Sequence, residues 1–473
     1  MRKSFAAFSA LATAAALVLM PGAASADGEE NQVDTSGLES SDNNRFIIGY
    51  KSSITLQKQG AGVDSVNSVL SKHGVSVEAQ REMSTGGKVI ELNKGLDKKA
   101  AAALLADIAK DPAVEYVEPD VKMFPTWTPS DRYYDYQWHY HRSNVGIDAP
   151  TAWNTTRGRG VTVAILDTGI TSHPDLNKNV VSGYDMISDS WAAGDGNGRD
   201  SNPRDEGDWI NANTCGNRYF QSSSWHGTHV AGTVAASAND GGVVGVAPEA
   251  KILPVRVLGK CGGYTSDIAD GIVWASGGSV WGTSRNYHPA SVINMSLGGR
   301  SNSCPYTYQR AINTATSNGA TVVVAAGNDG RNAWSTTPAN CSNVLTIGAT
   351  DRYGAQSYYS NYGSVVDVSA PGGDTSYRGH GVLSTVNSGR TYPSTSSYAY
   401  YQGTSMATPH VAGVAALVKA ANPRLSATDV ANVIRNSTKR MPGRCWGGSC
   451  GTGLVDAGKA VQKAKNTNVR YWW

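Results

Sequence analysis

Between residues 45 and 123, short strand-like runs of apolar residues are interrupted by two segments of helical period. We predict strands where apolar residues alternate or cluster, and helices where they recur every three or four positions. The predicted strands are 45–51, 75–83, 87–93 and 113–123, and the predicted helices are 63–74 and 98–112. This βαββαβ order is the split-βαβ pattern of a small ferredoxin-like domain. By position alone, such a domain could be a binding module in front of an enzyme.

A different pattern begins at Val161. Continuous apolar runs, which suit strands covered on both faces, alternate with segments of helical spacing. The apolar runs are 161–167, 251–259, 291–299, 321–328 and 344–350, and the helical segments are 266–276, 306–319, 405–421 and 426–437. The alternation predicts an α/β domain with a mainly parallel sheet flanked by helices. Chemistry in such sheets lies where strands end, so residues just past these strands are the candidates.

The first 26 residues have the pattern of a secretory signal peptide. Met1-Arg2-Lys3 is a basic start, residues 10–20 are apolar but too few to span a bilayer, and Ala24-Ser25-Ala26 is a small-x-small cleavage pattern. The alternative is a membrane anchor. We predict that the chain is secreted and extracellular, and that it has no membrane partner.

Composition and charge exclude one class of partner. The chain has 473 residues and a net charge of +3, and no basic block is interleaved with aromatic residues, so we expect no nucleic-acid partner. All six cysteines lie in the later part of the chain, and three disulfide bonds fit an oxidising compartment. Fifteen pairings are possible. We favour neighbours in sequence, which are Cys215–Cys261, Cys304–Cys341 and Cys445–Cys450, because no CxxC pairs suggest zinc.

Three polar residues stand where apolar packing does not explain them. Asp167 directly follows the strand-like run "VTVAIL", His226 lies in "SSWHGTHVAGT", and Ser405 opens "SMATPHVAGVAAL". Each alone has a plainer interpretation: a turn aspartate, a capping or packing histidine, and a helix N-cap.

Together the three residues have a chemical logic. A serine hydroxyl becomes a useful nucleophile when an imidazole takes its proton, and a carboxylate holds that imidazole in the required tautomer. Asn328, at the end of "VVVAAGN", adds an amide that could donate to an oxyanion formed beside Ser405. Taken alone, Asn328 would be interpreted as a turn residue between glycines.

Five segments carry a family resemblance: "AILDTGI", "HGTHVAGT", "VINMSLGG", "AAGNDG" and "GTSMATPHVAG". From about Gln137 to about Lys463, the chain resembles the subtilisin-like serine proteases. The resemblance implies a triad of Asp167, His226 and Ser405, with Asn328 as the oxyanion donor and protein or peptide as the substrate. His229 falls where the family carries a structural residue. We expect a serine endopeptidase that acts through an acyl-enzyme, as a monomer.

The resemblance gives the first domain a role. Members of this family carry an N-terminal propeptide of βαββαβ type, which assists folding as an intramolecular chaperone and then inhibits the enzyme. We therefore expect a signal peptide at 1–26, a propeptide at 27–127 with its folded domain at about 45–123, and a catalytic domain at 128–473. The cut should fall within 123–131, an exposed Pro-rich linker, and we favour the bond between Trp127 and Thr128. We expect no further domain after the closing segment "GLVDAGKAVQKA".

The resemblance also implies calcium. "AASANDGGVVGVAP" is similar to the family's high-affinity calcium loop, and its hard oxygen atoms suit Ca²⁺. The implied ligands are the side chains of Asn239, Asp175 and Gln137 and the carbonyls of Ser237, Gly241 and Val243. A second ion could be held in "GDGNGRDSNPRDEGDW", an insertion that lacks the closing glutamate of an EF-hand. Its candidate ligands are Asp195, Asn197, Asp200, Asp205 and Asp208, and the alternative is a solvated acidic loop.

Substrate preference is predicted from family position. Two segments, Ser296-Leu297-Gly298 and Ala325-Ala326-Gly327, should wall the primary pocket, and Gly262-Gly263 should pair with extended substrate backbone. These walls are apolar and carry no carboxylate, which favours broad cleavage after apolar or aromatic residues over cleavage after Lys or Arg.

Two other classes of function predict sequence features that this chain lacks. A binding protein on an inactive protease scaffold should have lost a triad or oxyanion residue, and none is lost. A lipase-like hydrolase needs a G-x-S-x-G elbow and the order Ser, Asp, His, whereas Ser405 lies in "GTSMA" at the end of the order Asp, His, Ser.

Overall fold

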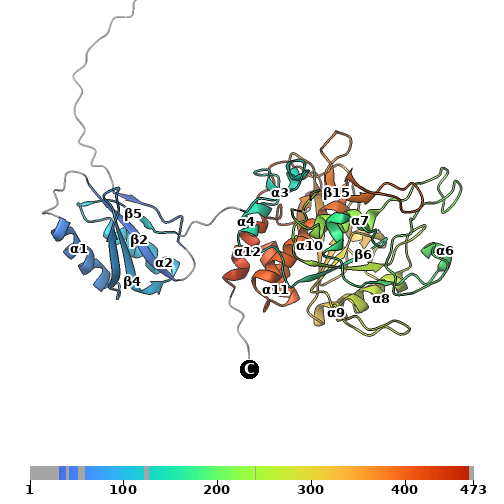
Figure 1. Cartoon of the computed structure of the whole chain (residues 1–473), viewed down its shortest axis with the longest axis horizontal. Helices are drawn as coiled ribbons and strands as arrows, with labels where there is room; N and C mark the ends of the chain where they lie inside the picture. Colours follow the sequence, from blue (N-terminus) through green and yellow to red (C-terminus); the bar gives the residue numbers. More distant parts are fainter. Residues whose placement is uncertain (1–30, 39–41, 52–58, 122–126, 240, 468–473) are drawn as a thin grey trace, which may run out of the picture. The chain divides into compact units, whose positions relative to one another are not determined.

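The computed structural model describes residues 31–38, 42–51, 59–121, 127–239 and 241–467. The chain divides into two compact units, Met1–Met123 and Phe124–Trp473 (Figure 1). The predicted signal peptide and residues 123–126 of the segment in which we expect the propeptide cut lie outside the described residues. Among the helices that are described, none is long and apolar enough to cross a membrane.

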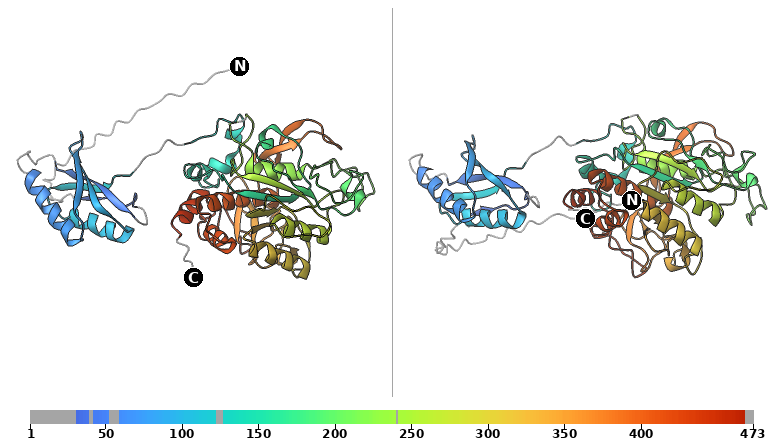
Figure 2. Two further views of the ribbon diagram at one scale, coloured as in Figure 1. Left: turned by 60° about the horizontal axis from the view of Figure 1, so that its bottom comes forward. Right: turned by 90° about the horizontal axis from the view of Figure 1, so that it is seen from below.

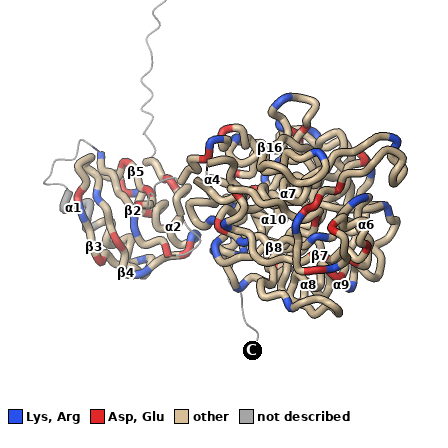
Figure 3. The backbone as a smooth tube through the Cα atoms, turned by 45° about the vertical axis from the view of Figure 1, so that its right-hand side comes forward, with Lys and Arg blue, Asp and Glu red and all other residues tan. Residues whose placement is uncertain are grey.

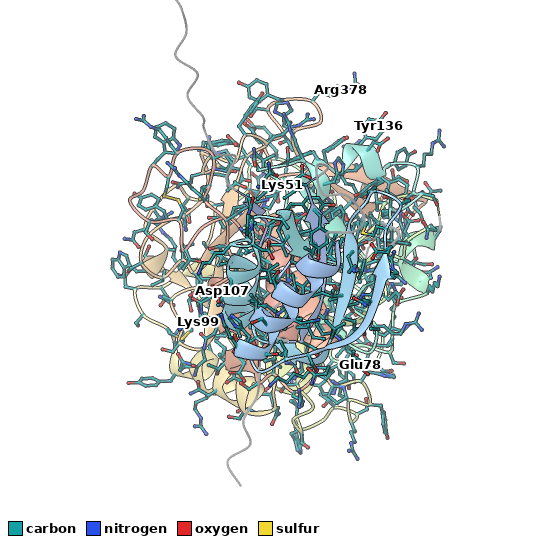
Figure 4. All side chains as sticks on the ribbon, turned by 90° about the vertical axis from the view of Figure 1, so that its left-hand side faces the viewer. Lys51, Glu78, Lys99, Asp107, Tyr136 and Arg378 are labelled. Carbon is teal, nitrogen blue, oxygen red and sulfur yellow. A yellow bond between two sulfur atoms is a disulfide. The ribbon has the colours of Figure 1, made fainter. Side chains whose placement is uncertain are left out.

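The first unit has the predicted order of strands and helices, with a short edge strand added. Its elements are β1 (Gln32–Val33), β2 (Asn43–Tyr50), α1 (Gln59–Lys72), β3 (Val77–Glu82), β4 (Lys88–Leu96), α2 (Lys98–Ile108) and β5 (Val114–Pro119). The strands form one sheet in the order β1-β5-β2-β4-β3. Leu70 of α1 and Leu104 of α2 share a core with Phe46 of β2, so both helices pack on the sheet. In Figure 4 the labelled Lys99 and Asp107 mark α2.

The second unit is built on a seven-stranded, wholly parallel sheet, as the sequence predicts. The strand order is β14-β13-β11-β9-β6-β8-β7, and each neighbouring pair is parallel (Figure 2). The strands are β6 (Thr162–Asp167), β7 (Tyr184–Asp185), β8 (Lys251–Arg256), β9 (Val292–Met295), β11 (Thr321–Ala325), β13 (Val344–Thr350) and β14 (Val368–Pro371). Because β6, β9 and β11 are adjacent, the residues that follow them lie at one edge of the sheet.

Helices cover both faces of this sheet. Successive side chains of a strand point to opposite faces, and in β6 Val163 and Ile165 join one core while Ala164 and Leu166 join the other. The first core includes α7 (His226–Ala235), α10 (Thr404–Ala421), α11 (Ala427–Arg435) and α12 (Ala457–Lys465). The second includes α8 (Thr265–Ala275) and α9 (Tyr306–Ser317). Both α7 and α10 begin beside the carboxyl ends of central strands, because His226 contacts Asp167 at the end of β6 and Thr404 contacts Asn328 just after β11.

An antiparallel hairpin of β15 (Val382–Asn387) and β16 (Ser396–Tyr401) lies outside the main sheet and was not predicted. Its first strand includes hydroxyl side chains, which obscure the apolar pattern. Ser384 and Thr385 are nevertheless buried, because their hydroxyls donate to the carbonyls of His229 and Thr228 on α7 at 2.8 Å each. The hairpin thereby holds α7 in place.

The three disulfide bonds pair as we favoured: Cys215–Cys261, Cys304–Cys341 and Cys445–Cys450. The first one ties the loop that precedes α7 to the segment just after β8, beside Gly262. Basic and acidic residues are interspersed around β7 and α6 (Ser190–Ala193) in Figure 3.

Candidate active site

Asp167 and His226 form a hydrogen-bonded pair at the edge of the sheet. Asp167 ends β6 and is fully buried, and His226 is the first residue of α7. The Nδ1 atom of His226 lies 2.7 Å from Oδ1 of Asp167, an oxygen that also accepts the Thr168 N–H at 2.8 Å. Because the carboxylate can only accept, the imidazole proton resides on Nδ1, and Nε2 is left as a proton acceptor.

The charges around His226 favour its protonated form. Burial lowers the pKa of the imidazole, but the charge of Asp167, its hydrogen bond and the charges of Asp208 and Asp205 outweigh burial and raise the pKa above its ordinary value. The other Asp167 oxygen, Oδ2, is buried without a hydrogen-bond partner among the described residues. An imidazolium formed during a reaction would therefore meet an uncompensated buried charge.

Ser405 is the second residue of α10, and it does not cap that helix. The N-cap is Gly403, and no side chain caps there. Pro409 lies in the helix and has no N–H, so the Ser405 carbonyl lacks its usual helical donor. Ser296 supplies one instead: its hydroxyl donates to the Ser405 carbonyl at 2.8 Å, and the Ser405 hydroxyl donates to the Ser296 carbonyl at 3.2 Å. The Ser405 hydroxyl therefore lies in the cleft and makes no hydrogen bond that caps the helix.

Asn328 is oriented by the start of the same helix. Its side-chain oxygen accepts the N–H and the hydroxyl of Thr404 at 2.8 and 2.9 Å. Both partners are donors there, so the oxygen atom must face Thr404 and the NH₂ group must face away from it. Asn328 and Ser405 line the same hollow of about 700 Å³, into which that amide can donate.

His226 lines an adjoining hollow, which shares Leu258, Cys261, Gly262 and Ser296 with the hollow that contains Ser405. His226, Ser405 and Asn328 therefore line two adjoining hollows that share Ser296, and the buried Asp167 holds His226 from behind. A general base, a hydroxyl and an amide donor arranged in this way can perform acyl transfer.

Most of the predicted substrate-contacting residues line the hollow beside Ser405. They are Gly262, Gly263, Ser296, Leu297, Gly298, Ala325 and Gly327. The prediction for Ala326 is wrong: it is fully buried in a small separate core with Ala333 and Val366, because alternate residues of an extended chain face opposite sides.

Sequence reasoning missed other parts of this hollow. Tyr308, Thr265 and Ile268 line it from α8 and α9, elements that no local motif connects to the site. Arg300 and Asp329 also line it, so charged residues outside the two predicted wall segments contribute to the hollow. Asp329 is ion-paired with Arg331, which compensates its charge.

His229 has a structural position, in line with the prediction. It is fully buried one turn after His226, and its Nε2 lies 3.0 Å from the Val382 carbonyl and 3.2 Å from the Ala399 carbonyl. Its ring stacks on Tyr401 at a centroid distance of 4.5 Å. His229 thus joins α7 to both strands of the hairpin.

The predicted calcium loop contains a partial set of oxygen ligands. Asp175 is buried, its Oδ2 accepts the Val243 N–H at 2.8 Å and the Tyr398 hydroxyl at 3.0 Å, and its carbonyl accepts from Ser237. Gly241 has φ +113°, a conformation that favours glycine and turns the loop. The Gln137 amide is paired with Val244 in both directions, at 3.0 and 2.9 Å, and the Asn239 Oδ1 atom already accepts the Ser130 N–H and hydroxyl at 2.9 and 3.0 Å.

Asp131, which sequence reasoning missed, is a better ligand than Gln137. It is buried, its Oδ2 accepts the Asn239 N–H at 2.9 Å, and its Oδ1 is buried with no hydrogen-bond partner among the described residues. Burial raises the pKa of Asp175, and the charge of Asp131 raises it further. Two neighbouring buried carboxylates with an unpaired oxygen fit a bound divalent cation.

The five candidates for a second ion do not form one ligand group. No cluster of three or more acidic, histidine or cysteine side chains suited to a metal occurs in the described part of the chain. Asp195 contacts Arg256, and Asn197 donates to Asp200 at 2.8 Å. Asp205 and Asp208 instead accept from Thr168 and Ser224 beside His226. The donors that these carboxylates need come from the protein, so we correct the prediction of one shared site.

Comparisons with known proteins show which proteins this chain is similar to. A family model described as "Subtilase family" matches residues 158–466. The chain is 49% identical over 432 residues to an extracellular protease of Xanthomonas campestris, covering 89% of this chain and 73% of that protein. It is 44% identical over 433 residues to an extracellular basic protease of Dichelobacter nodosus, covering 88% and 70%. A solved protease structure from Pseudoalteromonas arctica is 57% identical, with a TM-score of 0.70, covering 72% of this chain and 100% of that one.

Proposed function

The chain belongs to the subtilase family of serine proteases, and from this premise we propose that it is a secreted endopeptidase that uses Ser405, His226 and Asp167 as its triad. The observation that carries the proposal is the 2.7 Å bond between His226 and Asp167, at a cleft that Ser405 and Asn328 also line. Secretion is supported by relatives that are named extracellular proteases.

The proposed reaction begins when the Ser405 hydroxyl leaves its bond to Ser296 and gives its proton to Nε2 of His226. Oγ then attacks the scissile carbonyl, while Asp167 stabilises the imidazolium. The carbonyl oxygen becomes an oxyanion that the Asn328 NH₂ and the Ser405 N–H can bind, because N–H groups in the first turn of a helix have no intrahelical acceptor. His226 then protonates the leaving amine, and water hydrolyses the acyl-enzyme by the reverse steps.

Labelling the secreted protein with a serine-directed phosphonylating reagent tests the proposal. We expect one adduct, mapped to the peptide that contains Ser405, together with complete loss of peptidase activity. An adduct on another serine, or peptidase activity that survives full labelling of Ser405, would contradict the assignment.

Activity should fall at acid pH as His226 becomes protonated, since an imidazolium cannot accept the serine proton. The pKa of this group is raised by Asp167, Asp208 and Asp205 despite burial, so we expect the midpoint of the acidic limb above about 6.5, the usual value for histidine. The measurement is kcat/KM from pH 5 to 9 on a peptide substrate. A rate that stays flat across this range would exclude His226 as the base.

Calcium is proposed at the site of Asp131, Asp175 and Asn239, with the carbonyls of Ser237, Gly241 and Val243 completing the ligand set. A bound ion would stabilise the loop that these residues form.

A chelator should therefore speed thermal inactivation and autolysis. An ion that binds only the folded state adds about 2.7 kcal/mol when its concentration is 100 times Kd. Asp131→Asn and Asn239→Ala should each lower Tm in calcium and make it insensitive to chelator. Asp135→Asn, at an exposed neighbouring position, serves as the control. If Tm of the unmodified enzyme is the same with and without chelator, the calcium proposal is wrong.

The size of the hollow beside Ser405 supports cleavage after large apolar or aromatic residues. Leu258, Ile268 and Tyr308 contribute apolar surface, and the Asp329 carboxylate is ion-paired, so a lysine or arginine side chain gains little there. Gly262 and Gly263 would pair with substrate backbone, a mode of recognition that reads little sequence.

We also propose that the first unit is a propeptide that is removed by the enzyme itself, which then acts as a monomer. Its βαββαβ order supports this role. The favoured cut follows Trp127, whose ring packs edge-on against Trp153 at 5.2 Å and whose N–H donates to Asn154 at 3.2 Å.

A further inference from the structure

A hydrogen-bonded relay runs from the backbone of His226 to Asp208. The His226 N–H donates to the Ser224 hydroxyl at 3.3 Å, and that hydroxyl donates to Oδ2 of Asp208 at 2.7 Å. The Ser224 N–H donates to the other oxygen, Oδ1, at 2.6 Å. Both carboxylate oxygens of Asp208 therefore hold the residue that precedes Trp225 and His226.

A second relay reaches the next residue of α7 from the opposite side. The Gly227 N–H donates to the Thr168 hydroxyl at 3.0 Å, and this hydroxyl donates to Oδ2 of Asp205 at 2.7 Å. Oδ1 of Asp205 accepts the Gly207 N–H at 2.9 Å, which fixes the carboxylate within its own loop. Thr168 is also the residue whose N–H donates to Asp167. The second relay thus connects Asp167 and His226, the hydrogen-bonded dyad of the site, through the residues that follow each of them, Thr168 and Gly227.

The two relays supply hydrogen-bond acceptors and negative charge at the start of α7. The first N–H groups of α7 have no acceptor within the helix, and its positive end favours negative charge. Trp225, immediately before His226, has φ +51°, which is costly for a large side chain and needs external support. Its indole N–H donates to the Gly389 carbonyl at 2.7 Å, so this turn is held from several sides.

We propose that Asp208, acting through Ser224, and Asp205, acting through Thr168, are positioning residues that hold the His226 imidazole against Asp167. The inference rests on the proposed function of that dyad. It gives the acidic insertion a role in catalysis, where the sequence suggested metal binding.

The same carboxylates add to the electrostatic field at His226. Burial lowers the pKa of its imidazole, and the charges of Asp167, Asp208 and Asp205 raise it. Burial also raises the pKa of Asp205, to about 7, so its contribution depends on pH. The titratable groups near the imidazole are Asp167 on β6, Asp205 and Asp208 in the insertion, His229 on α7 and Tyr401 on β16.

The test compares Asp208→Asn, Ser224→Ala and a matched control, Asp200→Asn, in the mature enzyme. Asp200 belongs to the same insertion, and its side chain accepts only from Asn197 and Asn202 in the bonds described. We expect Asp208→Asn to lower kcat about 10-fold with KM unchanged, because the base is less well held. Loss of its charge should move the acidic midpoint of kcat/KM down by about half a pH unit.

Ser224→Ala separates position from charge. It removes the relay but keeps the Asp208 carboxylate, so kcat should fall by a similar factor while the midpoint stays within about 0.2 pH units of the unmodified enzyme. In the double variant that combines Asp208→Asn with Ser224→Ala, the two losses in kcat should not multiply, since both substitutions act on one relay. Asp208→Glu, which keeps the charge, should restore the midpoint.

The second relay is tested by Thr168→Val, which removes the hydroxyl but keeps the shape of the side chain. We expect about a 10-fold lower kcat. When Thr168→Val is combined with Ser224→Ala, kcat should fall by more than the product of the two single factors, because the two losses in activation free energy are then more than additive.

A variant that only destabilises the fold would lower Tm without moving the pH midpoint. If Asp208→Asn matches Asp200→Asn in both kcat and midpoint, or if Thr168→Val and Ser224→Ala leave kcat unchanged, the inference is overturned. An unmodified enzyme with no acidic limb at all would instead contradict the proposed function. The two failures are therefore distinguishable.

Discussion

Replacing Asn328 with alanine should lower kcat by about 10² to 10³ and leave KM nearly unchanged, because the variant loses a donor that acts on the oxyanion and not on the ground-state substrate. The orientation of the amide is the basis for this expectation. Thr404 donates twice to the side-chain oxygen, so the NH₂ group is directed away from α10 before substrate arrives. A preorganised donor needs no rearrangement when charge develops on the substrate.

Asn332→Ala is the matched control for that experiment. Asn332 lies four positions later, and its side-chain oxygen caps a short turn by accepting the Trp334 N–H at 3.1 Å. Its loss should lower Tm and leave kcat unchanged. If Asn328→Ala raises KM at constant kcat, the residue binds substrate, and if it lowers only Tm, it is a turn residue. Either outcome would remove Asn328 from the oxyanion site.

Strand periodicity was sufficient to predict the frame of the cleft. Long apolar runs identified β6, β9 and β11, and the rule that chemistry follows strand ends identified Asp167 and Asn328. The side of the sheet to which one residue faces was harder to predict. Ala326 belongs to the same motif as Ala325 and Gly327, yet it points into a separate core.

Residues that depend on distant partners could not be predicted from local sequence. Asp131 and Asn239 are 108 positions apart, and only the fold brings a buried, unpaired carboxylate oxygen to the calcium loop. The hairpin was missed for a related reason: the polar residues Ser384 and Thr385 are buried because they reach carbonyls of α7, which the sequence pattern of the strand does not contain.

The acidic composition of the insertion could not show whether its carboxylates bind a cation or accept hydrogen bonds from the protein. A carboxylate that accepts from protein hydroxyls and one that binds a cation look the same in sequence. Asp205 and Asp208 find their donors on Thr168 and Ser224, residues that adjoin the catalytic dyad. The resemblance to the family carried no information on these two residues, because the insertion is a departure from the family pattern.

The largest effect is expected from Ser405→Ala, and its clearest signature is a failure of maturation. In subtilisin, removal of the serine costs about 2 × 10⁶ in kcat, so self-processing at the same site would effectively stop. The secreted variant should therefore keep its first unit and begin near Asp27. In the unmodified chain the Ser405 hydroxyl donates only to Ser296 among the bonds described, and it caps no helix. The fold should therefore tolerate its removal.

Ser426→Ala provides the contrast that makes this result specific. Ser426 is a true N-cap: its hydroxyl accepts the Asp429 N–H at 3.2 Å in a capping box at the start of α11. Its loss should cost about 0.5 to 2 kcal/mol of stability and leave processing intact. The measurement is the mass of each secreted variant from a host that lacks other extracellular proteases. A Ser405→Ala chain that begins near Thr128 would mean that another enzyme makes the cut, or that Ser405 is not the nucleophile. Adding a trace of active enzyme separates the remaining cases, because a folded, inactive precursor should then be cut in trans and release a stable second unit, whereas a misfolded one should be degraded.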